Sequence, residues 1–251
     1  MDATYANSYR ALYERHWWWR AREPFLLDQL RRGLATGSAG RILDVGCGDG
    51  LFFDKLSEFG QVEGVEPNGA LVSPGRHGGR IHIGPFDESF SPPHRYSAVL
   101  MLDVLEHLEY PDKAVRHALR LLETDGRLVV TVPAFKLLWT NHDDINQHFT
   151  RYTKKSFLDL AQRSGLQVDR CRYFFFWLFP VKLVARVCEA VLRSEPAPAK
   201  VPPRFINTAL TQLSRLEEAV GGQLPIPFGS SLLAIGHKSS RTDREGGGLW
   251  R

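Results

Sequence analysis

The stretch Arg41-Ile-Leu-Asp-Val-Gly-Cys-Gly-Asp-Gly50 is the clearest indication of the fold of this chain. An apolar run typical of a strand ends in a glycine-rich turn, and residues 50–59 then place apolar side chains at helical spacing. Gly46 and Gly48 carry no Cβ, so the backbone of the turn can approach a ligand closely. Strand, glycine turn and helix together predict a nucleotide-type binding corner.

The spacing of the glycines and the nearby acids indicate which ligand this corner holds. The pattern is Gly-x-Gly-x-Gly, and Leu51 stands where the dinucleotide fingerprint requires its third glycine. Asp44 and Asp49 flank the turn and would repel a pyrophosphate, because like charges repel. A cationic ligand with an amino-acid end suits the turn better. S-adenosylmethionine, with its sulfonium and α-amino group, is such a ligand.

Three segments in order resemble class I S-adenosylmethionine-dependent methyltransferases. The first is residues 42–50; the second, Gln61-Val-Glu-Gly-Val-Glu-Pro67, ends in Glu66, near the spacing at which a carboxylate meets a ribose. The third, residues 96–108, is similar to the fourth-strand segment of ubiquinone-biosynthesis O-methyltransferases. The resemblance implies a Rossmann-like α/β fold with a seven-stranded sheet and a terminal antiparallel hairpin. It also implies S-adenosyl-L-methionine as cofactor and S-adenosyl-L-homocysteine as product.

Strands and helices alternate after residue 40, which favours a parallel sheet. The expected strands are 41–45, 61–65, 80–83, 97–101, 127–132, 167–174 and 230–238, and the expected helices are 50–59, 68–74, 111–123, 154–164, 181–193 and 205–220. The chain is thereby predicted to divide into an N-terminal helical aromatic lid (1–40), an α/β core (41–175), a helical cap insert (176–229), a last core strand (230–238) and a disordered tail (239–251).

Composition excludes several classes of protein. The 251 residues carry a net charge of only +4, without a Lys/Arg block, so we expect no nucleic-acid partner. The three cysteines form no Cys-x-x-Cys pair, which argues against structural zinc or disulfides and favours the cytoplasm. The N-terminus has no signal-peptide core, and no run of 18 uncharged apolar residues exists, so we expect no membrane-spanning helix.

The resemblance assigns the cofactor to the ends of the first two strands. Asp44 organises the turn and the methionine amino group there, while Gly46 and Gly48 let the backbone approach. Glu66 would accept both ribose hydroxyls, since a carboxylate offers two acceptor oxygens. The plain alternatives are a tight turn for the glycines and a solvated strand-end acid for Glu66.

Other cofactor contacts are expected from the lid and from later strand ends. In the lid, Trp18 would lie over the cofactor and Arg22 would pair with its carboxylate; the alternative is that the tryptophans only close a hydrophobic lid. After the third strand, Asp87 is a candidate adenine contact, loosely matched. Leu102 and Asp103 end the fourth strand, at the edge where ligands bind in open α/β sheets; Asp103 could instead cap the next turn.

Acceptor chemistry is expected in the polar, aromatic insert of residues 139–152, which follows the fifth strand. His148 could act as general base toward a hydroxyl acceptor, or could with Arg151 bind Asp143 or Asp144 and only shape the loop. His107, in the third motif, is a candidate for cofactor contact and catalysis, with a local structural role as the alternative. We predict no metal site.

The region after residue 172 leaves its role open. The apolar run 173–179 could be core strand and homodimer interface, or could join the amphipathic helix 181–193 in peripheral contact with lipid. Residues 224–234 resemble, more loosely, bacterial methyltransferases of sugar and natural-product pathways.

The predicted activity is methyl transfer from S-adenosylmethionine to a small-molecule or biosynthetic-intermediate acceptor, first at oxygen. Nitrogen or carbon acceptors are the alternatives. A non-catalytic cofactor-binding scaffold is the rival from another class, and a nicotinamide dehydrogenase is disfavoured by Leu51.

Overall fold

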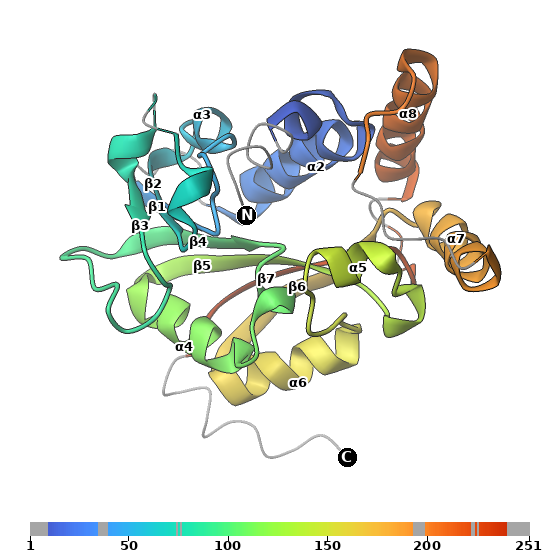
Figure 1. Ribbon diagram of the computed structural model, residues 1–251. Helices are drawn as coiled ribbons and strands as arrows, with labels where there is room; N and C mark the ends of the chain where they lie inside the picture. Colours follow the sequence, from blue (N-terminus) through green and yellow to red (C-terminus); the bar gives the residue numbers. More distant parts are fainter. Residues whose placement is uncertain are drawn as a thin grey trace, which may run out of the picture.

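A seven-stranded sheet forms the centre of the molecule (Figure 1). The structure is a computed structural model and describes residues 10–34, 40–73, 75, 77–192, 199–221, 224 and 226–239. The strand order is β3-β2-β1-β4-β5-β7-β6. The strands are β1 (Gly40–Val45), β2 (Gly60–Glu66), β3 (Ile81–Ile83), β4 (Tyr96–Leu102), β5 (Leu122–Pro133), β6 (Leu166–Phe174) and β7 (Ser231–Lys238).

The pairing pattern confirms the predicted fold class. Strands β1 to β5 pair in parallel, whereas β7 pairs antiparallel to both β5 and β6. Strand β1 lies between β2 and β4, so the chain order reverses direction beside it. Ligands bind at such a switch point, outside the carboxyl ends of the strands.

Helices cover both faces of the sheet and bury its apolar side chains (Figure 1). Helices α4 (Pro111–Leu121) and α6 (Lys154–Ser164) pack on one face, and α2 (Trp17–Gly33) and α3 (Phe53–Leu56) pack on the other. The central strands β1 and β4 are therefore nearly continuous apolar runs, as expected for strands buried on both sides.

Several predicted helices are shorter in the structure. The helix expected at 50–59 is reduced to α3. It begins only at Phe53 because Gly50, with φ +68°, keeps residues 50–52 in the turn. Of the helix expected at 68–74, the described residues form only the 3₁₀ turn η1 (Gly69–Leu71). Helix α4 ends at Leu121 because Leu122 already pairs with Tyr96 and begins β5, which starts five residues before its predicted position.

The N-terminal lid and the insert after β5 both carry helical structure. Residues 10–15 are helical, and α2 begins after His16, whose Nδ1 accepts from the backbone N–H of Trp18 at 3.2 Å. Residues 134–152 form one segment, called the insert from here on, and contain η4 (Lys136–Leu138) and α5 (Asn141–Ile145). The start of the predicted lid, most of the turn at 36–40, the linker at 193–198 and the tail from 240 onward lie outside the described residues.

The late apolar run belongs to the core. Most side chains of segment 173–179 are buried in the protein, and these are Tyr173, Phe174, Phe175, Phe176 and Leu178. These residues therefore belong to the hydrophobic core. The cap helices α7 (Leu178–Leu192) and α8 (Arg204–Gly221) follow, and α8 packs against α2. Among the described helices, none is both long and apolar enough to cross a membrane.

Candidate active site

The glycine turn has a left-handed backbone conformation that residues other than glycine rarely adopt. Gly46, Gly48 and Gly50 have φ of 71°, 55° and 68°. A Cβ on Gly46 would lie 2.9 Å from Val104 Cγ2, so this position also requires glycine for space. A Cβ on Gly48 would meet no atom within 4 Å, so the turn faces open space there.

Glu66 holds the glycine turn in place from the end of β2. One carboxylate oxygen, Oε2, accepts the backbone N–H of Gly48 at 2.9 Å, and Oε1 accepts that of Asn68 at 2.9 Å. The side chain is buried, with 5% of the residue exposed. Two fixed acceptor oxygens therefore lie beside the turn, where a pair of adjacent hydroxyls could share them.

Asp44, at the end of β1, is buried beside Arg22 and Glu66. Burial raises the pKa of its carboxyl to about 7; the negative charge of Glu66 adds to this rise and the Arg22 guanidinium opposes it. Because burial makes the ionised form of Asp44 unfavourable, a bound cationic ligand would stabilise that form.

Arg22, from α2, binds the end of β4. Its Nη2 lies 2.7 Å from Asp103 Oδ2 and donates to Thr131 Oγ1 at 2.7 Å, and the Thr131 hydroxyl in turn donates to Asp103 Oδ1 at 3.1 Å. The guanidinium lies 4.9 Å from the ring centroid of Trp18, a cation–π contact. Asp103 has φ 58° and pairs with Arg22, so it does not serve as a cap. Thr131 was missed, because no sequence pattern marks a buried threonine within a strand.

A cavity of about 60 Å³ lies between the lid, the start of the glycine turn and the ends of β1 and β4. Its walls include Tyr13 and Trp19 from the lid, Asp44 and Leu102 from the strand ends, and Gly46 from the turn. Arg22 also lines it, and its buried Nε has no hydrogen-bond partner among the described residues. An unused guanidinium donor, a buried carboxylate and a glycine turn fit the carboxylate, ammonium and backbone of an amino-acid ligand. S-adenosylmethionine has such an end.

Two features lie apart from this cavity. Asp87 is exposed, and its carboxylate accepts from the backbone and hydroxyl of Ser89, whose hydrogen bonds lower its pKa. A larger cavity of about 780 Å³ lies between α2, β6 and α8, and none of the predicted site residues lines it. Arg172 there is paired with Glu218 at 2.8 Å, so its charge is already neutralised.

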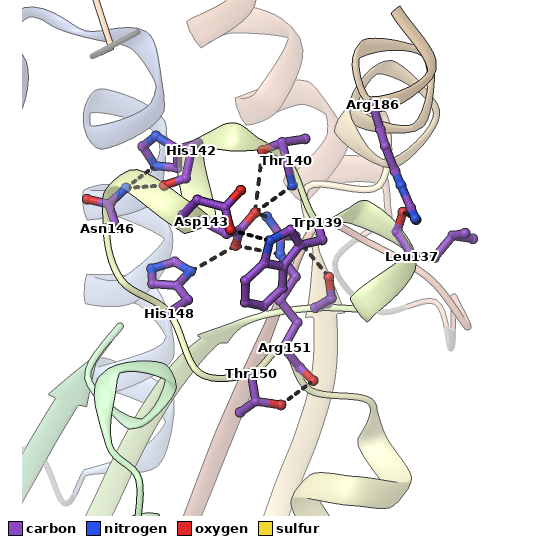
Figure 2. Close-up of polar contacts among 12 residues, drawn as sticks. Leu137, Trp139, Thr140, His142, Asp143, Asn146, His148, Thr150, Arg151 and Arg186 are labelled. Atoms are coloured by element: carbon purple, nitrogen blue, oxygen red, sulfur yellow. Dashed lines mark hydrogen bonds and ion pairs between the residues drawn. The ribbon is translucent and has the colours of Figure 1, made fainter. Parts of the chain in front are cut away.

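A second polar cluster, built on Asp143, lies in the insert (Figure 2). The Asp143 carboxylate is fully buried and accepts from Arg151 Nε at 2.7 Å and Nη2 at 2.8 Å. It also accepts the backbone N–H of Thr140 at 2.9 Å, within the capping box of α5. Burial alone would raise the pKa of Asp143, but the hydrogen bonds from His148 and Arg151 outweigh burial and hold the pKa well below its usual range.

The same carboxylate orients His148. Nδ1 of His148 lies 2.8 Å from Asp143 Oδ1, and the backbone N–H of His148 donates to the backbone carbonyl of Asp143 at 3.0 Å. The bond through Nδ1 turns the other ring nitrogen, Nε2, away from Asp143 (Figure 2). A carboxylate that fixes one imidazole nitrogen and leaves the other for the substrate is the arrangement of a general base.

His107 and Glu106 lie next to His148, on the 3₁₀ turn η3 (Leu105–His107). The His107 and His148 rings are 4.7 Å apart, edge to face. Partial burial lowers the pKa of His107, and the His148 ring lowers it further. Burial, with the charge of Asp103, raises the pKa of Glu106 well above its ordinary value, which favours the neutral form of this side chain.

These three side chains could also hold a cation. One ligand atom from each of Glu106, His107 and His148 lies within 4.8 Å of the others, and Glu106 Oε2 is buried without a hydrogen-bond partner among the described residues. Two imidazoles and a carboxylate are ligands that divalent metals accept. The geometry is compatible with a metal, and the Asp143 contact orients His148 independently of one.

Comparisons with known proteins identify the family. A family model described as a methyltransferase domain matches residues 18–170, more than half of the chain. The ubiquinone biosynthesis O-methyltransferase of Bradyrhizobium diazoefficiens is 31% identical over 98 residues, which cover 36% of this chain and 39% of that protein. Its counterpart in Alkalilimnicola ehrlichii is 30% identical over 117 residues, covering 42% and 47%. The matched part is thus less than half the length of these curated relatives.

Solved structures show the same fold. A Haloferax volcanii methyltransferase, solved in complex with its activator protein, superimposes with a TM-score of 0.59 at 14% identity and covers 95% of this chain and 96% of that chain. An S-adenosylmethionine-dependent methyltransferase of Archaeoglobus fulgidus gives 0.54 at 15% identity, with coverage of 86% and 94%. The family match over both the glycine turn and the third motif identifies the chain as a member of the methyltransferase-domain family, an enzyme that uses S-adenosylmethionine.

Proposed function

We propose that this methyltransferase acts on an oxygen atom of a small-molecule acceptor, with His148 as general base. The observation that carries the proposal is the His148–Asp143 contact of 2.8 Å in an insert that follows β5. When bound, the cofactor supplies a methyl group already activated by its sulfonium sulfur. His148 Nε2 takes the hydroxyl proton while the acceptor oxygen bonds to the methyl carbon and the carbon–sulfur bond breaks. The products are the methyl ether, S-adenosylhomocysteine and a protonated imidazole.

The remaining site residues bind and position the cofactor in this proposal. Asp44 receives the ammonium group, Arg22 the carboxylate through its unpaired Nε, and Glu66 the ribose hydroxyls. Catalysis then consists mainly of holding acceptor and methyl group in line, which is worth several orders of magnitude in rate. The name of the curated O-methyltransferase relatives also favours oxygen over nitrogen or carbon.

Cofactor entry requires movement of the lid. A cavity of about 60 Å³ has room for a few water molecules only. Tyr13 donates to Glu23 of α2 at 2.7 Å, and Arg10 pairs with Asp49 of the glycine turn, so these contacts hold residues 10–15 to both elements. We infer that this segment moves aside when the nucleoside binds. The three cysteines are free thiols, which supports the cytoplasm as the working compartment.

The test separates chemistry from binding. His148→Ala should lower turnover of a hydroxyl acceptor by about 10²–10⁴-fold, while calorimetry shows nearly unchanged affinity for S-adenosylmethionine. Added imidazole should restore part of the rate. A panel of phenols and catechols with methyl-labelled cofactor supplies the acceptor.

His237→Ala is the matched control. His237 also contacts a carboxylate through Nδ1, at 2.9 Å from Asp169, but lies on β7 and outside the insert. It should retain full activity. Equal activity of His148→Ala and the wild type would refute the base and leave catalysis to positioning; loss of cofactor binding would make His148 a structural residue.

A further inference from the structure

The cap helix α8 turns its polar side toward the protein. Asn207, Thr211 and Ser214 are buried on that side, at 6% exposure or less. Asn207 accepts the backbone N–H of Trp17 at 2.7 Å and donates to the carbonyl of Arg15 at 2.6 Å. An amphipathic helix on a globular protein normally buries its apolar side instead.

The apolar side of α8 consequently faces outward. Phe205, Leu216 and Val220 are 75%, 60% and 70% exposed, and Ile206 and Leu213 are exposed beside them. Their spacing of three and four residues places them on one side of the helix. Leu210 packs against the core from the inner side of α8, whereas this outer row does not.

Helix α7 shows the same inversion. Val181, Val184 and Val187 form an exposed row, with Val184 at 62%. On the opposite side, Arg186 donates to the Leu137 carbonyl, and Glu189 accepts the backbone N–H of Asn141 at 3.1 Å. The charged side of α7 therefore binds the insert. The two exposed rows together are the outer cap face: Val181, Val184, Val187, Phe205, Ile206, Leu213, Leu216 and Val220.

The charges around the outer cap face are predominantly basic. Arg204 and Arg215 are exposed on α8, and Lys200 is exposed in the segment that precedes it. Of the acids in the described parts of 178–221, Glu189, Glu217 and Glu218 are all partly buried and accept hydrogen bonds from elsewhere in the protein. An apolar surface bordered by Lys and Arg matches the interface of an anionic bilayer.

We propose that the outer cap face docks on an anionic phospholipid membrane. The valine and leucine rows would enter the headgroup boundary while Lys200, Arg204 and Arg215 meet lipid phosphates. A second copy fits less well, because an isologous dimer would bring the same basic residues together across its two-fold axis. Both helices lie at the same end of the molecule (Figure 1).

Docking would place the membrane beside the insert. Helix α7 contacts the insert through Arg186 and Glu189, and the same insert carries His148. The proposal is independent of the reaction assigned to His148, because it concerns binding to vesicles in the absence of any acceptor.

Co-sedimentation of the full chain with vesicles tests the proposal. Vesicles of phosphatidylglycerol and phosphatidylcholine should retain the protein, and pure phosphatidylcholine vesicles should retain it weakly. Leu213→Glu with Leu216→Glu should lower the partition coefficient by roughly tenfold or more. Arg204→Glu with Arg215→Glu should lower it by a similar factor and reduce its salt dependence, since each basic residue contributes about fivefold at an anionic surface.

Leu158→Glu is the matched control, because Leu158 is an exposed leucine on α6, which packs on the opposite face of the sheet. It should bind vesicles like the wild type, and all variants should keep the wild-type circular dichroism. Equal retention of the Leu213/Leu216 variant would overturn the proposal. So would a dimer in sedimentation velocity that the same variant dissociates, combined with no vesicle binding. Retention after a high-salt, high-pH wash would contradict peripheral docking.

Discussion

The glycine-turn half of the site and the insert half meet at one sheet edge but are held by different interactions. In the first half, strand ends and positive-φ glycines fix the backbone, and Glu66 ties the turn through two backbone N–H groups. In the second half, the insert is fixed by one buried carboxylate, Asp143, with Arg151 and His148 around it. The first half therefore depends on geometry that the backbone provides, whereas the second depends on a single charge pair.

The largest expected effect follows from breaking that charge pair. Asp143→Ala leaves the Arg151 guanidinium buried without its partner, which should lower the free energy of unfolding by about 3–5 kcal/mol. Urea denaturation of the purified protein measures it. If the insert were held mainly by its backbone, the loss would be small and the contrast between the two halves would disappear.

Two further variants test whether the loss of stability comes from the unpaired charge of Arg151. Asp144→Ala removes a neighbouring acid whose contact, with Trp139 Nε1 at 2.9 Å, lies at the surface, and should cost about 1 kcal/mol or less. Asp143→Ala combined with Arg151→Met removes both charges and should recover part of the lost stability.

The next effect concerns the strand ends. Asp44→Ala and Glu66→Ala should each weaken S-adenosylmethionine binding by about 1.5–3 kcal/mol, roughly 10- to 150-fold, because each loses a hydrogen bond to a polar or charged group of the cofactor. Calorimetry gives the dissociation constants. Asp159→Ala, an exposed acid on α6, is the control that should bind normally. Unchanged affinity in both variants would remove the cofactor from this cavity.

A smaller effect should appear as pH dependence of the same affinity. Burial raises the pKa of Asp44 to about 7, so below this pH the free enzyme carries a neutral acid that must lose its proton to pair with the cofactor ammonium. Affinity should therefore rise by up to roughly tenfold per pH unit toward pH 7 and level off above it. The range of about pH 5 to 7.5 avoids titration of the amino group itself. Asp44→Asn should flatten the profile; an unchanged slope in that variant would assign the titration to another group.

The smallest effect is expected at Glu106. Burial raises its pKa well above the ordinary value, so the folded protein favours the protonated form over a pH range in which the unfolded chain is already ionised. The native side chain therefore costs stability as pH rises above the unfolded pKa. Glu106→Gln should leave thermal stability at pH 7 unchanged or slightly raised, with the gain vanishing near pH 4. A large loss of stability at pH 7 would show that the carboxylate is ionised, as in a metal site.

In the glycine-turn half, the positions of the acidic side chains could be predicted because strand ends can be recognised in the sequence. Asp44, Glu66 and Asp103 all lie at carboxyl ends of β1, β2 and β4, which parallel pairing brings to one edge. Thr131 escaped prediction because a threonine inside a strand has no distinguishing spacing. The predicted helix at 50–59 was too long for a related reason, because the spacing of apolar residues contains no information about the positive φ of Gly50.

The insert and the cap show what periodicity leaves out. Asp143 and Asp144 are adjacent and chemically equal in sequence, and only the three-dimensional position of Arg151 selects Asp143 as its buried partner. In α8 the apolar stripe was predictable, but its outward direction depends on Asn207 and Ser214 finding partners on Trp17 and Trp177. Such long-range partners are absent from any local pattern.

The position of β7 between β5 and β6 sets the order in which the chain can fold during synthesis. Strand β6 pairs only with β7, although residues 166–174 leave the ribosome more than fifty residues earlier than residues 231–238. Until β7 emerges, the nascent protein presents the open edge of β5 and an unpaired β6, both targets for edge-to-edge aggregation. We expect stalled or truncated chains that lack residues 231–238 to depend on chaperones.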